Sequence, residues 1–136
     1  MAEFPKPKPG SVFYEDEKCY ACLAFQRKNV KGKTIVAWKA DVEDLNDLSE
    51  KDYQHLMKVV YVVRLALKIV YRTDNVYVAC LNEAKHVHWH LFPRCRGGIE
   101  GFELMTQPQE DLPEEDLKKV PGLKLLTEKY ARLRRW

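Results

Sequence analysis

The stretch HVHWHLF, from His86 to Phe92, decides how this chain is expected to fold. Imidazole and apolar side chains alternate along it, and a period of two residues is the pattern of a β-strand. Because successive side chains on a strand point to opposite faces, Val87, Trp89 and Leu91 lie on one face and the histidines on the other. The pattern predicts a strand anchored under a helix by its apolar face, with its histidines facing a groove.

A long amphipathic helix is predicted upstream of this strand. Ser49, followed three residues later by Asp52, forms a variant of the capping box that opens a helix, and the pattern continues to about Tyr71. Apolar residues recur within it at spacings of three and four, which gives one stripe about twenty residues long. The stripe consists of Leu56, Val59, Val60, Val63, Leu67 and Val70. We expect this stripe to lie across a sheet.

Further strand-like runs are arranged as two hairpins. Residues 19–25 (CYACLAF) and 33–38 (KTIVAW) are apolar and β-branched, and Gly32 suits a positive-φ position in the turn between them. Residues 76–81 (VYVACL) precede the histidine strand, separated from it by the short NEAK segment. Strands before and after one long helix, joined by hairpins, predict an α+β domain with an antiparallel sheet.

The two ends of the chain differ from its middle. Residues 1–11 are proline-rich and predict a flexible arm. Residues 12–107 form the predicted catalytic domain, in which the glycine-rich segment after Pro93 is expected to be a loop or an edge strand. Residues 108–136 are a polar link followed by a last helix, with Pro121 in its first turn.

Composition limits the partners. The chain has 136 residues, enough for one domain, and its 23 basic residues are nearly balanced by 20 acidic ones, for a net charge of +3. That balance does not indicate binding to a nucleic acid polymer. No apolar run is long enough for a membrane helix and none at the start resembles a signal peptide, so we expect a cytoplasmic protein whose four cysteines stay reduced.

The histidine row itself admits three interpretations. Neighbouring imidazoles on one strand face lie about 6.6 Å apart, and neutral rings can attack an electrophile, hold a proton or coordinate a metal. Surface or core histidines without a chemical role are one alternative. A metal site is another, because histidines at i and i+2 of a strand both reach one zinc ion, although a catalytic zinc needs a third ligand.

The whole run also matches the pattern H-φ-H-φ-H-φ-φ, where φ is apolar, and thereby resembles the histidine triad family of nucleotide hydrolases and transferases. The segment GKTIVAWKADVEDLNDL at 32–48 and the Pro93-Arg94 pair extend the resemblance. It implies a homodimer of five-stranded antiparallel sheets. It also implies attack by His88 on the α-phosphate of a nucleotide, with hydrolysis of a nucleotidyl-histidine, while His86 and His90 hold phosphate oxygens.

Several positions depart from the family pattern. Members usually carry Gly-Gln-Ser or Gly-Gln-Thr before the triad, whereas NEAK stands here, so Asn82, Lys85 and Arg94 are the candidates for binding the substrate. Gly32-Lys33 replaces the usual Gly-His pair, and the acidic residue that commonly binds ribose is missing. The leaving group therefore stays open. A hydrolase of phosphoramidates or dinucleoside polyphosphates, a transferase or phosphorylase, and a nucleotide-binding adaptor are all compatible with the sequence.

The reaction implied by the resemblance requires no cofactor, but the sequence offers a candidate structural zinc site. Cys19 and Cys22 form a C-x-x-C pair, and some triad proteins complete a tetrahedral zinc site from such a pair. The resemblance implies that Asp41 and His86 would supply the other two ligands. The alternative is that both thiols are small core residues, as free cysteines often are.

Overall fold

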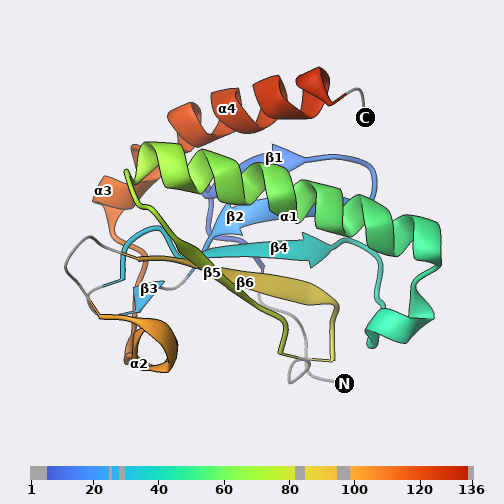
Figure 1. Ribbon diagram of the computed structural model, residues 1–136, viewed down its shortest axis with the longest axis horizontal. Helices are drawn as coiled ribbons and strands as arrows, with labels where there is room; N and C mark the ends of the chain where they lie inside the picture. The colour runs from blue at the N-terminus through green and yellow to red at the C-terminus, as the bar shows by residue number, and fades with distance from the viewer. Residues whose placement is uncertain (1–5, 25, 28–29, 82–84, 95–98, 135–136) are drawn as a thin grey trace.

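The computed structural model describes residues 6–24, 26–27, 30–81, 85–94 and 99–134. Its centre is a five-stranded antiparallel sheet of order β1-β2-β4-β6-β5, crossed on one face by the long helix α1 (Figure 1). The sheet strands are β1 (Val12–Glu15), β2 (Cys19–Leu23), β4 (Thr34–Trp38), β5 (Val76–Ala79) and β6 (His88–Pro93). The predicted α+β fold is confirmed.

Both predicted hairpins form. β2 pairs antiparallel with β4, and β5 pairs antiparallel with β6. Between β2 and β4 the backbone of Gly32 has a φ of +79°, as its place in a turn predicts, and a Cβ there would lie 2.6 Å from the Tyr71 ring. Glycine is therefore required at this position for two reasons, its dihedral angle and the close approach of the aromatic ring.

Helix α1 (Glu50–Val70) begins and ends where its sequence signals predict. The Ser49 side chain accepts a hydrogen bond from the Asp52 backbone N–H, and Tyr71 is the C-cap residue. The apolar stripe packs on the sheet residues Val36 and Leu91 in one core. Apolar burial of this kind, at roughly 25 cal/mol per Å², is what holds a helix against a sheet.

Helix α4 (Val120–Leu133) packs against both α1 and strand β1, so it lies beside α1 and covers the β1 edge of the same sheet face. Figure 1 shows the two helices next to each other. Leu123 and the preceding Leu112 belong to the same core as the sheet, and the Thr127 hydroxyl donates to the Phe13 carbonyl at 3.2 Å. The described part of this segment, through residue 134, is thus packed on the domain.

The remaining short elements were not evident from the sequence. The glycine-rich segment after β6 leads into a short helix, α2 (Gly101–Met105), where a loop or edge strand was expected. Within the polar link, β7 (Gln109–Glu110) pairs with β3 (Gln26–Arg27), and α3 (Glu114–Leu117) follows. Two-residue strands and single-turn helices carry too little hydrophobic periodicity to predict.

The described part of the predicted arm lies against the domain. Ser11 is buried, and its carbonyl accepts a hydrogen bond from the Leu23 N–H at 3.1 Å. Lys8 donates from its ammonium group to the Leu112 carbonyl at 3.4 Å. Within the described ranges, the longest apolar helical stretch falls short of what a membrane crossing needs.

Candidate active site

Strand β6 presents His88 and His90 on the sheet face opposite α1. In the register of the sheet, His90 pairs with Ile35 and His88 with Ala37, whereas the neighbouring Leu91 packs in the core under α1. This separation of faces follows from the alternation of side chains along a strand. The predicted groove face for the imidazoles is therefore the face that α1 leaves open.

The two imidazoles contact each other. Their ring centroids lie 4.7 Å apart with planes at 73°, and the two Nε2 atoms are 3.0 Å apart. The Nδ1 atom of His88 is 2.5 Å from the His86 carbonyl oxygen. A carbonyl only accepts hydrogen bonds, so His88 carries its proton on Nδ1 and directs the lone pair of Nε2 toward His90. The His90 Nε2–H is then the donor between the rings.

His86 does not join this row, which corrects the expectation of three rings in register. It precedes the first residue of β6, and its Nε2 lies 2.6 Å from the Trp38 carbonyl oxygen. The neighbouring Val87 makes irregular backbone bonds, donating to Val42 and accepting from Trp38. These bonds turn the chain just before the strand, so His86 acts on the site through its carbonyl group, which orients His88.

Electrostatics favour the neutral form of His88. Burial lowers the pKa of its imidazole, and the positive charge of Lys33 lowers it further, against the raising effect of the hydrogen bond to the His86 carbonyl. The ring is 4 % exposed. A neutral, buried imidazole with a directed lone pair is the form required of a nitrogen nucleophile.

Lys33 is a site residue that the sequence analysis did not select. It is buried, and its Nζ atom lies 5.6 Å from the centroid of the Phe92 ring, which stacks on His90. Lys33 lies two residues before Ile35, which pairs with His90, and residues two apart on a strand share a face. The alternation of side chains along the predicted strand 33–38 could therefore have placed Lys33 on the histidine face.

Two of the three predicted substrate-binding residues lie in the described part of the chain. Arg94 follows the far end of β6, where its guanidinium group pairs with Glu100 and lies 4.0 Å from Asp74. Lys85 is exposed and has a left-handed backbone, with φ of 51°. Asn82 lies outside the described residues. Substrate binding by these three residues stays a prediction.

The predicted zinc ligands are likewise not brought together. Cys19 faces the α1 core opposite Trp38, whereas Cys22 pairs with Ile35 on the histidine face, because residues three apart on a strand point in opposite directions. Asp41 is exposed and lies 4.0 Å from the Nδ1 atom of His86. A C-x-x-C pair inside a regular strand therefore cannot direct both sulfur atoms at one ion.

A cavity of about 370 Å³ opens beside the histidine face. Cys22 and Ile35 from the sheet line it, together with prolines of the N-terminal segment and Asp111 from the segment before α3. Its walls are mostly apolar. A larger cavity of about 580 Å³ lies near Tyr71 and Asp116, but no histidine lines it.

The fold and the histidine site define a class of protein: an antiparallel α+β domain with interacting imidazoles on the open face of its sheet. The family model described as the HIT domain matches residues 6–97. The chain therefore belongs to the histidine triad, or HIT, family, whose members are in general nucleotide hydrolases or transferases.

Comparisons with individual proteins agree with this assignment. An uncharacterised HIT-like protein of Methanocaldococcus jannaschii is 29% identical over 119 residues, covering 84% of this chain and 91% of the relative. A histidine triad nucleotide-binding protein of Sulfolobus tokodaii is 24% identical, with a TM-score of 0.71 over 90% of this chain and 86% of its own. Diadenosine triphosphate hydrolase of Plasmodium falciparum is 15% identical, with a TM-score of 0.70, and the match covers 95% of this chain and 84% of that protein.

Proposed function

We propose that this protein is a hydrolase that cleaves nucleotides at the α-phosphate, acting on a nucleoside phosphoramidate or a dinucleoside polyphosphate. The observation that carries the proposal is the hydrogen bond from His88 Nδ1 to the His86 carbonyl, which leaves the Nε2 lone pair as a nucleophile. The hydrolase of Plasmodium falciparum, with the same fold, acts on diadenosine triphosphate by its name. That likeness supports the substrate class.

The reaction proceeds in two balanced steps. His90 enters the first step as an imidazolium. His88 Nε2 attacks the α-phosphorus, the bond from phosphorus to the leaving group breaks, and the leaving group takes the Nε2 proton of His90, which becomes a neutral ring. Water then attacks phosphorus, the phosphorus–nitrogen bond breaks, and a water proton restores the His90 imidazolium. The 3.0 Å separation of the two Nε2 atoms supports joint action of donor and nucleophile at one phosphate.

The charge that develops on the phosphate oxygens needs a buried cation. We infer that Lys33 supplies it, because its ammonium group is buried on the histidine face and acts electrostatically on His88. A preformed cation in a site shielded from water stabilises developing charge more than an exposed one does. Lys33 thereby takes over part of the role of the missing Gly-Gln-Ser segment.

The nucleoside is proposed to occupy the cavity of about 370 Å³ beside the histidine face. Ile35 lines this cavity and pairs with His90 in the sheet, which brings an apolar wall for the base next to the site of attack. Asp111 lines the same cavity, and a carboxylate there accepts hydrogen bonds from ribose hydroxyls. It would replace the family's missing acidic residue from a different part of the chain.

Turnover of adenosine and guanosine phosphoramidates and dinucleoside polyphosphates, with and without inorganic phosphate, tests this proposal. Hydrolysis gives the nucleoside monophosphate, a phosphorylase gives the diphosphate only with added phosphate, and an adaptor gives neither.

A second experiment traps the intermediate. When a reaction with substrate labelled on the α-phosphate is quenched in alkaline denaturant, the label should stay on the native protein and be absent from His88→Asn. Loss of a nucleophile costs about 10⁶ in rate in a serine protease, whereas losing one donor, as in His90→Asn, costs roughly 10²–10³. Unchanged turnover by His88→Asn would exclude the mechanism.

We further propose a homodimer in which the sheets of two copies join. Strand β5 is an edge strand that pairs with β6 on one side, and edge strands are covered in stable proteins. Light scattering at micromolar concentration should give twice the chain mass, and a monomer would contradict the proposal.

A further inference from the structure

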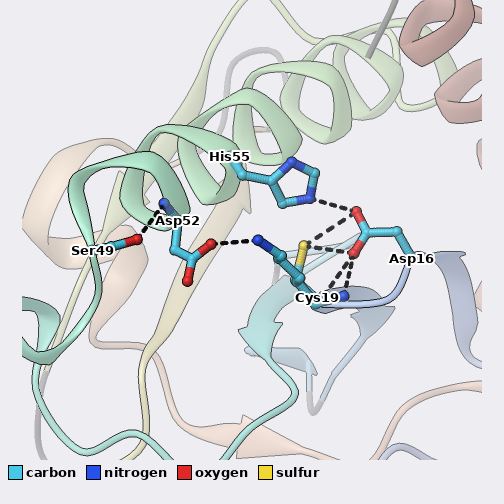
Figure 2. A network of polar contacts seen from close by, with 6 residues as sticks. Asp16, Cys19, Ser49, Asp52 and His55 are labelled. Carbon is cyan, nitrogen blue, oxygen red and sulfur yellow. Dashed lines mark hydrogen bonds and ion pairs between the residues drawn. The ribbon is translucent and has the colours of Figure 1, made fainter.

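A second cluster of reactive side chains lies on the opposite side of the sheet from His88. Asp16 is in the turn between β1 and β2, Cys19 is the first residue of β2, and His55 is in the second turn of α1. One carboxylate oxygen, the sulfur and one ring nitrogen all lie within 4.8 Å of one another. Figure 2 shows the three side chains converging from these separate elements.

The carboxylate of Asp16 is fixed in place by its own turn. Oδ1 accepts the backbone N–H groups of Lys18 and Cys19, each at 2.8 Å, and Oδ2 accepts the Tyr14 hydroxyl at 2.6 Å. These three hydrogen bonds hold both carboxylate oxygens in place. The cluster therefore contains a rigidly placed carboxylate.

The spacing between the sulfur and the carboxylate matches metal coordination. The sulfur of Cys19 lies 3.5 and 3.6 Å from the two carboxylate oxygens of Asp16. In a tetrahedral zinc site, a sulfur about 2.3 Å and an oxygen about 2.1 Å from the ion lie about 3.6 Å apart. His55 Nε2 lies 2.7 Å from the carboxylate, so its half-buried ring has to withdraw by roughly 0.7 Å to reach the tetrahedral spacing.

Two of the three side chains, Asp16 and His55, are reached from solvent. A cavity of about 280 Å³ is lined by Asp16 and His55, with Glu17, Lys18 and Lys51 around it, while Cys19 is buried beneath. The Lys18 ammonium is held 2.6 Å from Asp52 on α1. An ion can therefore enter from the cavity side, and a water molecule has room to complete its coordination.

We propose that Asp16, Cys19 and His55 bind one divalent cation of the zinc class, with water as the fourth ligand. On binding, the Cys19 S–H proton passes to solvent and a sulfur–metal bond forms. The His55 ring loses its Nε2 proton to solvent and takes up a proton on Nδ1, so that the Nε2 lone pair can bind the ion. The carboxylate and thiolate together balance the charge of the ion. The bound ion joins the β1–β2 turn to α1, which makes the site structural and separate from the histidine face.

Metal titration of the full-length chain, freed of metal with a chelator, tests this site. Cobalt(II) alone should bind at one ion per chain and produce the intense charge-transfer absorption of a thiolate–cobalt bond, and zinc should displace it. Cys19→Ser should abolish this absorption and weaken zinc binding at least about 100-fold, since even outer contacts of metal sites contribute 10–100-fold. His55→Gln, at a partly exposed position, should also weaken zinc binding.

Cys22→Ser is the matched control, because Cys22 lies on the same strand but faces the other side of the sheet. It should bind cobalt and zinc like the native chain, and so should His88→Asn. Three results would overturn the proposal: no thiolate–cobalt absorption in the native chain, loss of the absorption in Cys22→Ser but not in Cys19→Ser, or loss of zinc binding in His88→Asn.

Discussion

Replacing Lys33 by Met removes the buried positive charge on the histidine face while keeping an unbranched side chain of similar length. Lys33 is 4 % exposed and lies over the Phe92 ring, so the Met side chain fills the same space without a cavity. Removing one preorganised donor from an active site costs about 10²–10³ in rate, or roughly 2.7–4 kcal/mol of transition-state stabilisation. We expect a loss of that size in kcat/KM.

The same change should alter the pH dependence, which separates an electrostatic role from a packing role. Lys33 lowers the pKa of His88, so its removal should raise that pKa and move the acidic limb of the kcat/KM profile to higher pH. The assay is steady-state hydrolysis of the best substrate from pH 5 to 8, with thermal melting to verify the fold. Lys58→Met, at an exposed position on α1, is the control. Activity within threefold of native and an unmoved acidic limb would refute the reasoning.

Three further outcomes follow from the structure. In the native protein, burial holds the pKa of His88 below its ordinary value of about 6.5, so the ring is neutral at pH 6.5. The acidic limb of the kcat/KM profile should therefore lie below pH 6.5, and a limb at or above that pH would contradict the role of His88 as nucleophile. Gly32→Ala should lower the free energy of unfolding, measured with denaturant, by more than about 1–3 kcal/mol. The left-handed backbone at this position disfavours any residue with a Cβ, and the added methyl group would also collide with the Tyr71 ring. Leu91→Ala should cost about 2–5 kcal/mol since Leu91 is fully buried, and a change below 1 kcal/mol would argue against the face assignment.

Trp89 illustrates how far the alternation of a strand can be trusted. The pattern places its ring on the apolar face, and it does pack against the core under α1, but only partly buried. Alternation fixes the direction of a side chain, whereas the depth of burial depends on what the rest of the chain lays over it. Leu91 is therefore the sharper stability probe.

The sequence by itself determined the elements whose signals are local. The Ser49 cap, the stripe on α1, the glycine turn before β4 and the opposed faces of β6 all depend on neighbours within a few residues. Periodicity and capping report such interactions directly. The fold class and the pairing of His88 with His90 follow from them.

Only the tertiary structure decided which distant residues meet. His86 leaves the row because its ring contacts the Trp38 carbonyl of β4 and the backbone of the adjoining Val87 bonds to Trp38 and Val42. Lys33 faces Phe92 across strands. Asp16, Cys19 and His55 come together because the β1–β2 turn lies beside the start of α1. Each of these contacts joins segments far apart in the chain, and their geometry is set by the packing of the whole core, which no local pattern records.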